Sequence, residues 1–414
     1  MNFFSYRNGT LCAEKVPLPA VASQFGTPCY VYSRAALESA YRDFEQASAG
    51  RDVLICYAVK ANSNLAVLNL LARLGSGFDI VSGGELARVL TAGGAASKTV
   101  FSGVGKSEAE MRAALKAGIF CFNVESEGEL ERLSRVASEA GGKAPVSLRV
   151  NPDVDPGTHP YISTGLRENK FGIPHEEAPR LLCKAASLPG LLLVGIGFHI
   201  GSQITEIEPF VESLNKILEF ADLMEASGVR LRHIDVGGGL GIRYRDEQPP
   251  AAKNLVASLF ERMGRRKLKL LLEPGRALVG NAGILLAKIE YLKYGAVKNF
   301  AVVDAAMNDL LRPALYDAWQ DVLPVTMRNG PARRYDVVGP VCESADFLGR
   351  DRDLVLEDGD LIAVASAGAY GMSMSSNYNS RPRPAEVMVD GDAVHLVRER
   401  ERNEHLFASE RLLP

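Results

Sequence analysis

The chain has 414 residues and a formal net charge of −3, with 47% hydrophobic and 23% charged residues. This length exceeds that of one ordinary compact domain, so the sequence predicts two domains in a globular protein. The near-neutral charge argues against a nucleic-acid partner or an anionic membrane surface, and no apolar run is long enough to span a membrane.

The cysteines and histidines give no sign of a metal site. The six cysteines are scattered without a C-x-x-C pair, and the six histidines show neither H-x-H nor H-E-x-x-H spacing. The N-terminal residues lack the basic segment and the long apolar run of a signal peptide. We therefore expect no metal, no disulfide framework and a reducing, cytoplasmic location.

The predicted elements begin with a hairpin around Asn8–Gly9, a dipeptide typical of tight turns. From residue 53 to 275, short β-rich runs then alternate with helical stretches. The predicted strands are 53–59, 78–82, 99–103, 120–126, 146–152, 194–200, 232–238 and 268–274. Such alternation indicates parallel pairing, and eight units predict a TIM-type barrel. An open doubly wound sheet is the alternative, although no G-x-G-x-x-G follows an early strand.

Local signals mark several helix starts within this region. Three S-x-x-E sequences, at Ser82–Glu85, Ser107–Glu110 and Ser126–Glu129, fit the capping box that begins a helix. The connection 152–193, which contains HPYISTGLRENKFGI, is oversized for the link between the fifth and sixth strands. We expect it to form a lid or an interface element.

After about residue 276 the pattern changes to successive strand-like runs with turns between them. The runs are YDVVGPVC (335–342), DLVLEDGDLIAVASAG (353–368) and AEVMVDGDAVHLV (385–397), and Asp390–Gly391 is a second hairpin signal. The sequence therefore predicts an α/β barrel over residues 26–280. It also predicts an all-β domain formed by residues 1–25 together with 281–414.

Polar residues and glycines follow several of the predicted barrel strands, where a TIM barrel carries its active site. They are Lys60 after the first strand, His199 and Ser202 after the sixth, Gly237, Gly238 and Gly239 after the seventh, and Glu273 and Arg276 after the eighth. Each has a simpler explanation alone: a solvated lysine, a core histidine or a plain turn.

Together these residues match the needs of pyridoxal 5'-phosphate. A desolvated lysine can form a Schiff base with the cofactor aldehyde, and an imidazole can pack on the ring. Glycine amides can hold the phosphate, and a carboxylate can keep the pyridine nitrogen protonated. The sequence thus predicts a pyridoxal phosphate site at the mouth of the barrel.

Longer motifs in the same order resemble those of the fold-type III pyridoxal-phosphate-dependent decarboxylases and, within them, the diaminopimelate decarboxylases. The motifs are YAVKAN (57–62), SGGEL (82–86), HIGSQI (199–204), DVGGGLG (235–241), EPGR (273–276), RPALY (312–316), CESADFL (342–348) and GAYGMSMSSNYNSRPRPAEV (368–387). The resemblance covers essentially the whole chain. It implies an alanine racemase-like fold, an eight-stranded barrel with a β-domain that includes the N-terminus.

The resemblance also implies a role for each matching residue. Lys60 would bind the cofactor covalently, His199 would stack on its ring and Glu273 would pair with the ring nitrogen. The phosphate would be held by Ser202, Gly237, Gly238, Gly239 and Gly275, with Arg276 and Tyr370 close to both cofactor and substrate. The distal carboxylate of the substrate would be held by Arg276, Arg312 and Tyr316, its distal ammonium by Glu343, and the general acid would be Cys342. In the family the CESADFL segment reaches the partner's site, which implies a homodimer with shared active sites.

These roles lead to a substrate with an amino-acid head at each end. Arginines pair with carboxylates through two hydrogen bonds, so Arg276, Arg312 and Glu343 suit the distal head of meso-2,6-diaminopimelate. Decarboxylation would give L-lysine and CO2, the last step of lysine biosynthesis, and an acidic Glu273 favours this reaction over racemisation. Two alternatives stay open: a decarboxylase of a basic amino acid such as ornithine or arginine, and a non-catalytic binding protein on the same fold.

Overall fold

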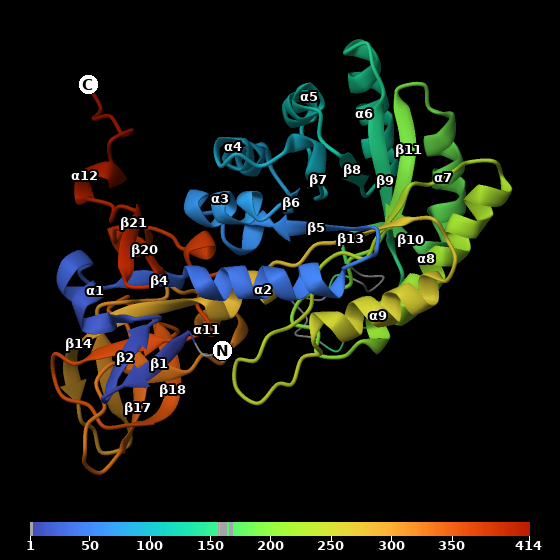
Figure 1. Cartoon of the computed structure of the whole chain (residues 1–414). Coiled ribbons are helices and arrows are strands. Elements are labelled where there is room, and N and C mark those ends of the chain that lie inside the picture. Colours follow the sequence, from blue (N-terminus) through green and yellow to red (C-terminus); the bar gives the residue numbers. More distant parts are fainter. Residues whose placement is uncertain (1–2, 156, 158–163, 165–168) are drawn as a thin grey trace. The chain divides into compact units, whose positions relative to one another are not determined.

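The computed structural model describes all residues except 1–2, 156, 158–163 and 165–168 (Figure 1). The chain forms two compact units. One contains residues 40–242 and 248–277, and the other contains residues 1–39, 243–247 and 278–414. No helix in the described part of the chain is long and apolar enough to cross a membrane.

The first unit is built on a closed barrel of eight parallel strands. The strands are β5 (Val53–Ala58), β6 (Gly77–Ile80), β7 (Thr99–Phe101), β8 (Cys121–Val124), β9 (Ala144–Asn151), β11 (Leu191–Gly197), β12 (His233–Asp235) and β13 (Lys269–Leu272). Pairing of β13 with β5 and of β8 with β9 closes the cylinder. All eight predicted strands and the barrel are confirmed, and the open-sheet alternative is wrong because the sheet edges pair with each other.

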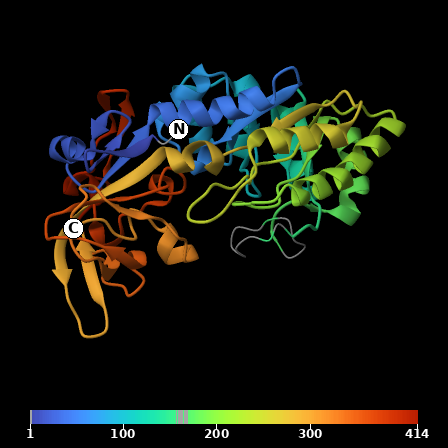
Figure 2. The ribbon, with the colours of Figure 1, turned by 60° about the horizontal axis from the view of Figure 1, so that its bottom comes forward.

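Helices connect the strands of this barrel (Figure 1). They are α3 (Leu65–Arg73), α4 (Gly83–Thr91), α5 (Glu108–Ala117), α6 (Glu127–Glu139), α7 (Ala178–Ser187), α8 (Glu208–Ala226), α9 (Ala252–Met263) and the short α10 (Arg276–Val279). The long helices α8 and α9 lie side by side, as the two ribbon views agree (Figure 2). The preceding α2 (Arg34–Ala47) spans the boundary between the units.

The predicted helix starts are confirmed, but only one of them is a reciprocal capping box. The hydroxyls of Ser82, Ser107 and Ser126 each accept a hydrogen bond from the backbone N–H three residues later. Only the Glu110 carboxylate accepts from the N–H of its own cap residue, Ser107. The Glu129 carboxylate accepts from the N–H of Glu125 instead, because the Lys106 ammonium draws it into a buried ion pair.

The predicted lid or interface element at 152–193 falls partly on residues outside the described part of the chain. Its described remainder includes the two-residue strand β10 (Ile173–Pro174), which pairs with β9, and helix α7. Leu181 and Leu182 of α7 are buried, and the helix packs against β11. This part is therefore the usual crossover helix of a parallel barrel.

The second unit is mostly sheet. Its small sheet contains β1 (Phe4–Arg7), β2 (Thr10–Ala13) and β3 (Val16–Pro17). Its larger sheet contains β4 (Cys29–Ser33), β14 (Gly283–Lys293), β15 (Asn299–Val303), β16 (Val322–Pro324), β17 (Arg333–Val338), β18 (Phe347–Leu354), β19 (Leu361–Val364), β20 (Ala385–Asp390) and β21 (Ala393–Arg398). The core between them includes buried residues from both sheets, such as Leu11, Val31 and Val387.

Both predicted hairpins are present in this unit. Asn8 and Gly9 have φ angles of 49° and 77° between β1 and β2, and Gly391 has φ 64° between β20 and β21. The predicted β-domain is confirmed as a mostly-sheet unit, which also contains the short helices α1 (Leu18–Phe25), α11 (Arg312–Tyr316) and α12 (Asn403–Leu406). The limit of this domain was predicted at residue 26, whereas β4 pairs with β14 and β20 of its sheet.

Candidate active site

A cavity of about 430 Å³ opens at the carboxyl ends of the barrel strands. Three of the predicted residues, Lys60, His199 and Glu273, line it. Sequence reasoning missed several other lining residues, among them Ser102, Asn123, Arg149 and Asp235. The convergence of Lys60, His199 and Glu273 follows from parallel strands, whose carboxyl ends lie at the same rim of the barrel.

Lys60 lies just beyond its strand. Strand β5 ends at Ala58, and Lys60 occupies a 3-10 turn over Val59–Ala61, so the strand ends slightly earlier than predicted. The Lys60 ammonium Nζ is 2.5 Å from Oδ2 of Asp79, a fully buried residue of β6. Asp79 is a further residue that sequence reasoning missed. An aspartate inside the apolar run FDIV was the available signal, because buried charges are almost always paired.

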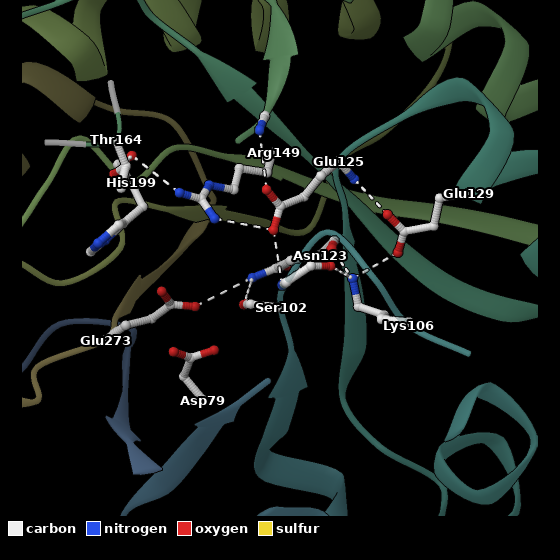
Figure 3. A network of polar contacts seen from close by, with 12 residues as sticks. Asp79, Ser102, Lys106, Asn123, Glu125, Glu129, Arg149, Thr164, His199 and Glu273 are labelled. Atoms are coloured by element: carbon white, nitrogen blue, oxygen red, sulfur yellow. Dashed lines mark hydrogen bonds and ion pairs between the residues drawn. The ribbon is translucent and has the colours of Figure 1, made fainter. Parts of the chain in front are cut away.

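Glu273 belongs to a cluster of buried carboxylates (Figure 3). A single amide group, Nδ2 of Asn123, donates to Oδ2 of Asp235 at 3.1 Å and to Oε1 of Glu273 at 3.3 Å. Burial raises the pKa of Glu273 well above its usual range, and the nearby carboxylates of Asp235 and Asp79 raise it further. Burial also raises the pKa of Asp235. A cationic ligand group at this place would relieve the repulsion among the carboxylates.

His199 presents a neutral imidazole to the cavity. Its Nδ1 accepts a hydrogen bond from the N–H of Gly238 at 3.1 Å, which leaves the ring proton on Nε2. Burial lowers the pKa of His199 well below its ordinary value, and the positive charges of Arg149 and Lys60 act in the same direction. A flat, uncharged ring of this kind can pack against an aromatic cofactor.

The glycines of the seventh and eighth strand ends are required by close backbone contacts. A Cβ on Gly238 would lie 2.0 Å from the carbonyl oxygen of Glu273, and one on Gly239 would lie 2.3 Å from that of Gly201. A Cβ on Gly275 would reach 3.1 Å from the Cβ atoms of Ala58 and Ala61. Only glycine lets these backbone segments approach one another so closely.

The N–H groups of these glycines divide into two kinds. Those of Gly237 and Gly238 donate to Asp235 and His199. Within the described part of the chain, those of Gly239 and Gly275 have no protein acceptor. The N–H groups of Gly239 and Gly275 are therefore suited to bind an anion such as a phosphate, while those of Gly237 and Gly238 hold the loop in shape.

Two more predicted residues meet beside this loop. Nη2 of Arg276, a buried residue, donates to Oγ of Ser202 at 2.9 Å. The contact joins the sixth and eighth strand ends, as expected for residues that serve one site.

A second layer of charges adjoins the cavity, and Arg149 of this layer is one of the lining residues (Figure 3). Nζ of Lys106 donates at 2.7 Å to the carbonyl oxygens of Gly103 and Asn123 and to Oε1 of Glu129. Nη1 of Arg149 donates at 3.1 Å to Oε1 of Glu125. This layer fixes the backbone of β8 at Asn123 and was not predicted, because Lys106 sits in a polar segment that suggests a solvated loop.

The remaining predicted residues lie in the sheet-rich unit and are described within it. Arg312 and Tyr316 are the two ends of helix α11, and the buried Arg312 stacks on the ring of Tyr244. Cys342 is exposed, with Sγ 3.4 Å from Oδ1 of Asn379.

Two other predicted residues of this unit have distinctive surroundings. Glu343, next to Cys342, accepts a hydrogen bond from the hydroxyl of Tyr378. Tyr370 has a left-handed φ of 55°, a strained conformation for a tyrosine. Such strain is often found at functional sites.

Comparison with known proteins places these features in a family. Residues 34–280 match the family model described as "Pyridoxal-dependent decarboxylase, pyridoxal binding domain". The chain is 60% identical to a diaminopimelate decarboxylase of Pseudomonas aeruginosa over the full length of both proteins. The crystal structure of diaminopimelate decarboxylase from Helicobacter pylori with L-lysine is 43% identical, has a TM-score of 0.92 and covers 95% of this chain and 99% of that one.

A more distant enzyme has a similar structure. The diaminopimelate decarboxylase of M. jannaschii in complex with L-lysine is 38% identical, with a TM-score of 0.95, and covers 100% of this chain and 98% of that chain.

Proposed function

Because the chain belongs to the family of pyridoxal-dependent decarboxylases, we propose that it converts meso-2,6-diaminopimelate to L-lysine and CO2, the last step of lysine biosynthesis. The observation that carries this proposal is the barrel cavity where Lys60, His199 and Glu273 converge, in a chain 60% identical to a full-length diaminopimelate decarboxylase. The free state of all six cysteines is consistent with the cytoplasmic location that we propose.

The residues of the barrel fit pyridoxal phosphate. Lys60 would attach the cofactor covalently, with Asp79 holding the amine in place. Glu273 would hold a proton on the ring nitrogen, and the neutral His199 would pack on the ring. The phosphate would bind the N–H groups of Gly239 and Gly275 beside Ser202 and Arg276. We also assign Tyr370 a role in binding the cofactor and the substrate, as the resemblance implies.

A bound cofactor would supply an electron sink for the bond that breaks between Cα and the carboxylate carbon. The substrate loses CO2 and gains a proton at Cα. We assign delivery of that proton to the Cys342 thiol. Asp79, Asp235 and Glu273 are all buried, and a positive charge on the ring nitrogen would relieve the repulsion among these carboxylates and be stabilised by them in return.

The distal amino-acid head of the substrate would be held by charge. We assign its carboxylate to Arg276, Arg312 and Tyr316, and its ammonium to Glu343. Ornithine, arginine and lysine lack a distal carboxylate, so a decarboxylase for them has no need of Arg312.

We further propose a homodimer in which Cys342 and Glu343 serve the partner subunit's site. Both residues are exposed in the single chain, which agrees with a role outside their own subunit. Mixing inactive Lys60→Ala and Cys342→Ala proteins tests this arrangement. Heterodimers with one complete site should regain part of the activity, and a lack of recovery after verified subunit exchange would contradict the shared site.

The reaction itself is tested by a substrate panel. Purified protein loaded with pyridoxal phosphate is given meso-diaminopimelate, ornithine, arginine or lysine, and CO2 and amine products are followed. We expect L-lysine from diaminopimelate alone. Turnover of a basic amino acid would refute the assigned substrate, and absence of turnover with a fully loaded cofactor would favour a non-catalytic role. The Lys60→Ala protein is the matched control for covalent loading.

A further inference from the structure

Five residues of the barrel's own sequence belong to the other unit. The chain leaves the barrel unit after Ile242, and Arg243–Glu247 groups with the sheet-rich unit before the barrel resumes at Gln248. We call Arg243–Glu247 the crossing segment. It begins only four residues after Gly239, so its assignment to the other unit needs a physical cause.

The first cause is a contact between Tyr244 and Arg312. The Arg312 guanidinium carbon lies 4.5 Å from the centre of the Tyr244 ring, and both residues are at least nine-tenths buried. A guanidinium has all its N–H donors in its plane. Stacking on its face therefore stabilises the cation without using a donor that a carboxylate would need.

The second cause is an anchor at the next residue. The Arg245 guanidinium carbon lies 4.2 Å from the centre of the Trp319 ring, and that of Arg352 lies 3.2 Å from it. Nε1 of Trp319 donates to Asp321 at 2.7 Å, which places a negative charge near the two arginines. The crossing segment is thus bound to the stretch 312–321 at both ends of that stretch.

The backbone of the crossing segment is fixed by its own carboxylate. Oε2 of Glu247 accepts from the N–H of Tyr244 at 3.0 Å and from the N–H of Arg245 at 2.7 Å. The tight turn held in this way fixes the positions of Tyr244 and Arg245 together. Tyr244 is therefore already ordered before a ligand binds.

We propose that Tyr244 is a positioning residue for Arg312, and that the crossing segment determines specificity for substrates with a distal carboxylate. The inference rests on the proposed function, in which Arg312 holds that carboxylate. An arginine side chain has many rotamers, and holding it ready for its ligand removes an ordering cost from binding. Loss of this ordering should weaken binding of the substrate without slowing the chemical step, because the distal head is held equally before and during that step.

The test uses the cofactor-loaded protein and L-lysine, which keeps the distal head after CO2 has left. Tyr244→Leu removes the aromatic face, and Tyr244→Phe keeps it as the matched control. We expect Tyr244→Leu to weaken L-lysine binding, measured by calorimetry, about tenfold. The KM for meso-diaminopimelate should rise by a similar factor with kcat changed less than about twofold. Tyr244→Phe should behave as the unchanged protein.

Several outcomes would overturn the inference. L-lysine affinity unchanged in Tyr244→Leu would show that the ring does not position Arg312, and a fall in kcat at constant KM would show a role in the chemistry. If Tyr244→Leu does not load cofactor, Tyr244→Met, whose flexible unbranched side chain fills irregular gaps, replaces it. Loss of loading in both would assign Tyr244 a general structural role. Failure of the unchanged protein to decarboxylate diaminopimelate would refute the proposed function separately.

Discussion

Replacing His233 by glutamine should make the fold less sensitive to acid. His233 begins strand β12, is 1% exposed, and lies with Nε2 3.9 Å from Sγ of Cys121. Its ring fills the space beside Gly195, where a Cβ would lie 2.1 Å from Nε2. Burial, with smaller contributions from Lys269 and Arg232, lowers the pKa of His233 to about 3.

The sign and size of the effect follow from proton linkage. An unfolded histidine has a pKa of about 6.5, so between that value and about 3 the unfolded chain binds a proton that the folded chain does not. The contribution of His233 to stability is complete above pH 6.5 and is lost as the pH falls. Between pH 7 and pH 5 the loss amounts to about 2 kcal/mol, at about 1.4 kcal/mol for each pH unit below 6.5.

The assay is urea unfolding at pH 7 and pH 5 at one protein concentration. His233→Gln should lower stability at pH 7 because glutamine fills the site less well. The difference between the variant and the unchanged protein should then shrink by about 2 kcal/mol at pH 5. All other titrating groups are common to both proteins and cancel in this comparison. An identical pH dependence in the two proteins would refute the argument that a neutral, buried His233 resists acid.

Three further predictions concern other buried groups. Lys106→Met should lower the free energy of unfolding, measured with urea, by about 3–5 kcal/mol, because it leaves the buried Glu129 carboxylate without its cation. The Lys106→Met/Glu129→Leu double variant should lose less than the sum of the two single changes, and additive losses would contradict a coupled pair. Gly238→Ala should destabilise the protein and abolish cofactor absorbance, because the new Cβ would lie 2.0 Å from the Glu273 carbonyl oxygen. The control Gly128→Ala, whose new Cβ has no atom within 4 Å, should leave both unchanged, and normal cofactor loading of Gly238→Ala would refute the prediction. Burial raises the pKa of Asp309 to about 6, so ionising this carboxyl costs the folded protein stability as the pH rises from about 4 through 6. Between pH 4 and pH 7 the free energy of unfolding of Asp309→Asn should therefore rise by about 2 kcal/mol relative to that of the unchanged protein, and a constant difference would show that Asp309 is not the titrating group.

Much of the barrel and part of the candidate site could be predicted from local patterns. Each strand is a short apolar run that ends in polar or glycine residues, and S-x-x-E sequences mark three helix starts. Once eight alternating units are recognised, the topology of a parallel barrel places Lys60, His199 and Glu273 at one rim. The structure confirms that convergence within one cavity.

The pairing of charges could not be read from the sequence. Asp79 holds Lys60, and Asn123 joins Asp235 to Glu273, across separations of 19 to 150 residues. Glu129 was predicted to cap its own helix, yet its carboxylate pairs with Lys106. Such contacts depend on strand register and on which side chains the barrel buries, because burial makes an unpaired charge costly and so selects its partner.

The amino-acid sequence by itself determined the order of strands and helices, the motifs of the cofactor site and the family, since these depend on local periodicity and on short contiguous patterns. Only the tertiary structure decided which glycine N–H groups remain for an anion and why residues 243–247 leave the barrel unit. The physical reason is that both depend on contacts between segments distant in the chain: the N–H of Gly238 donates to His199, 39 residues away, and Tyr244 stacks on Arg312.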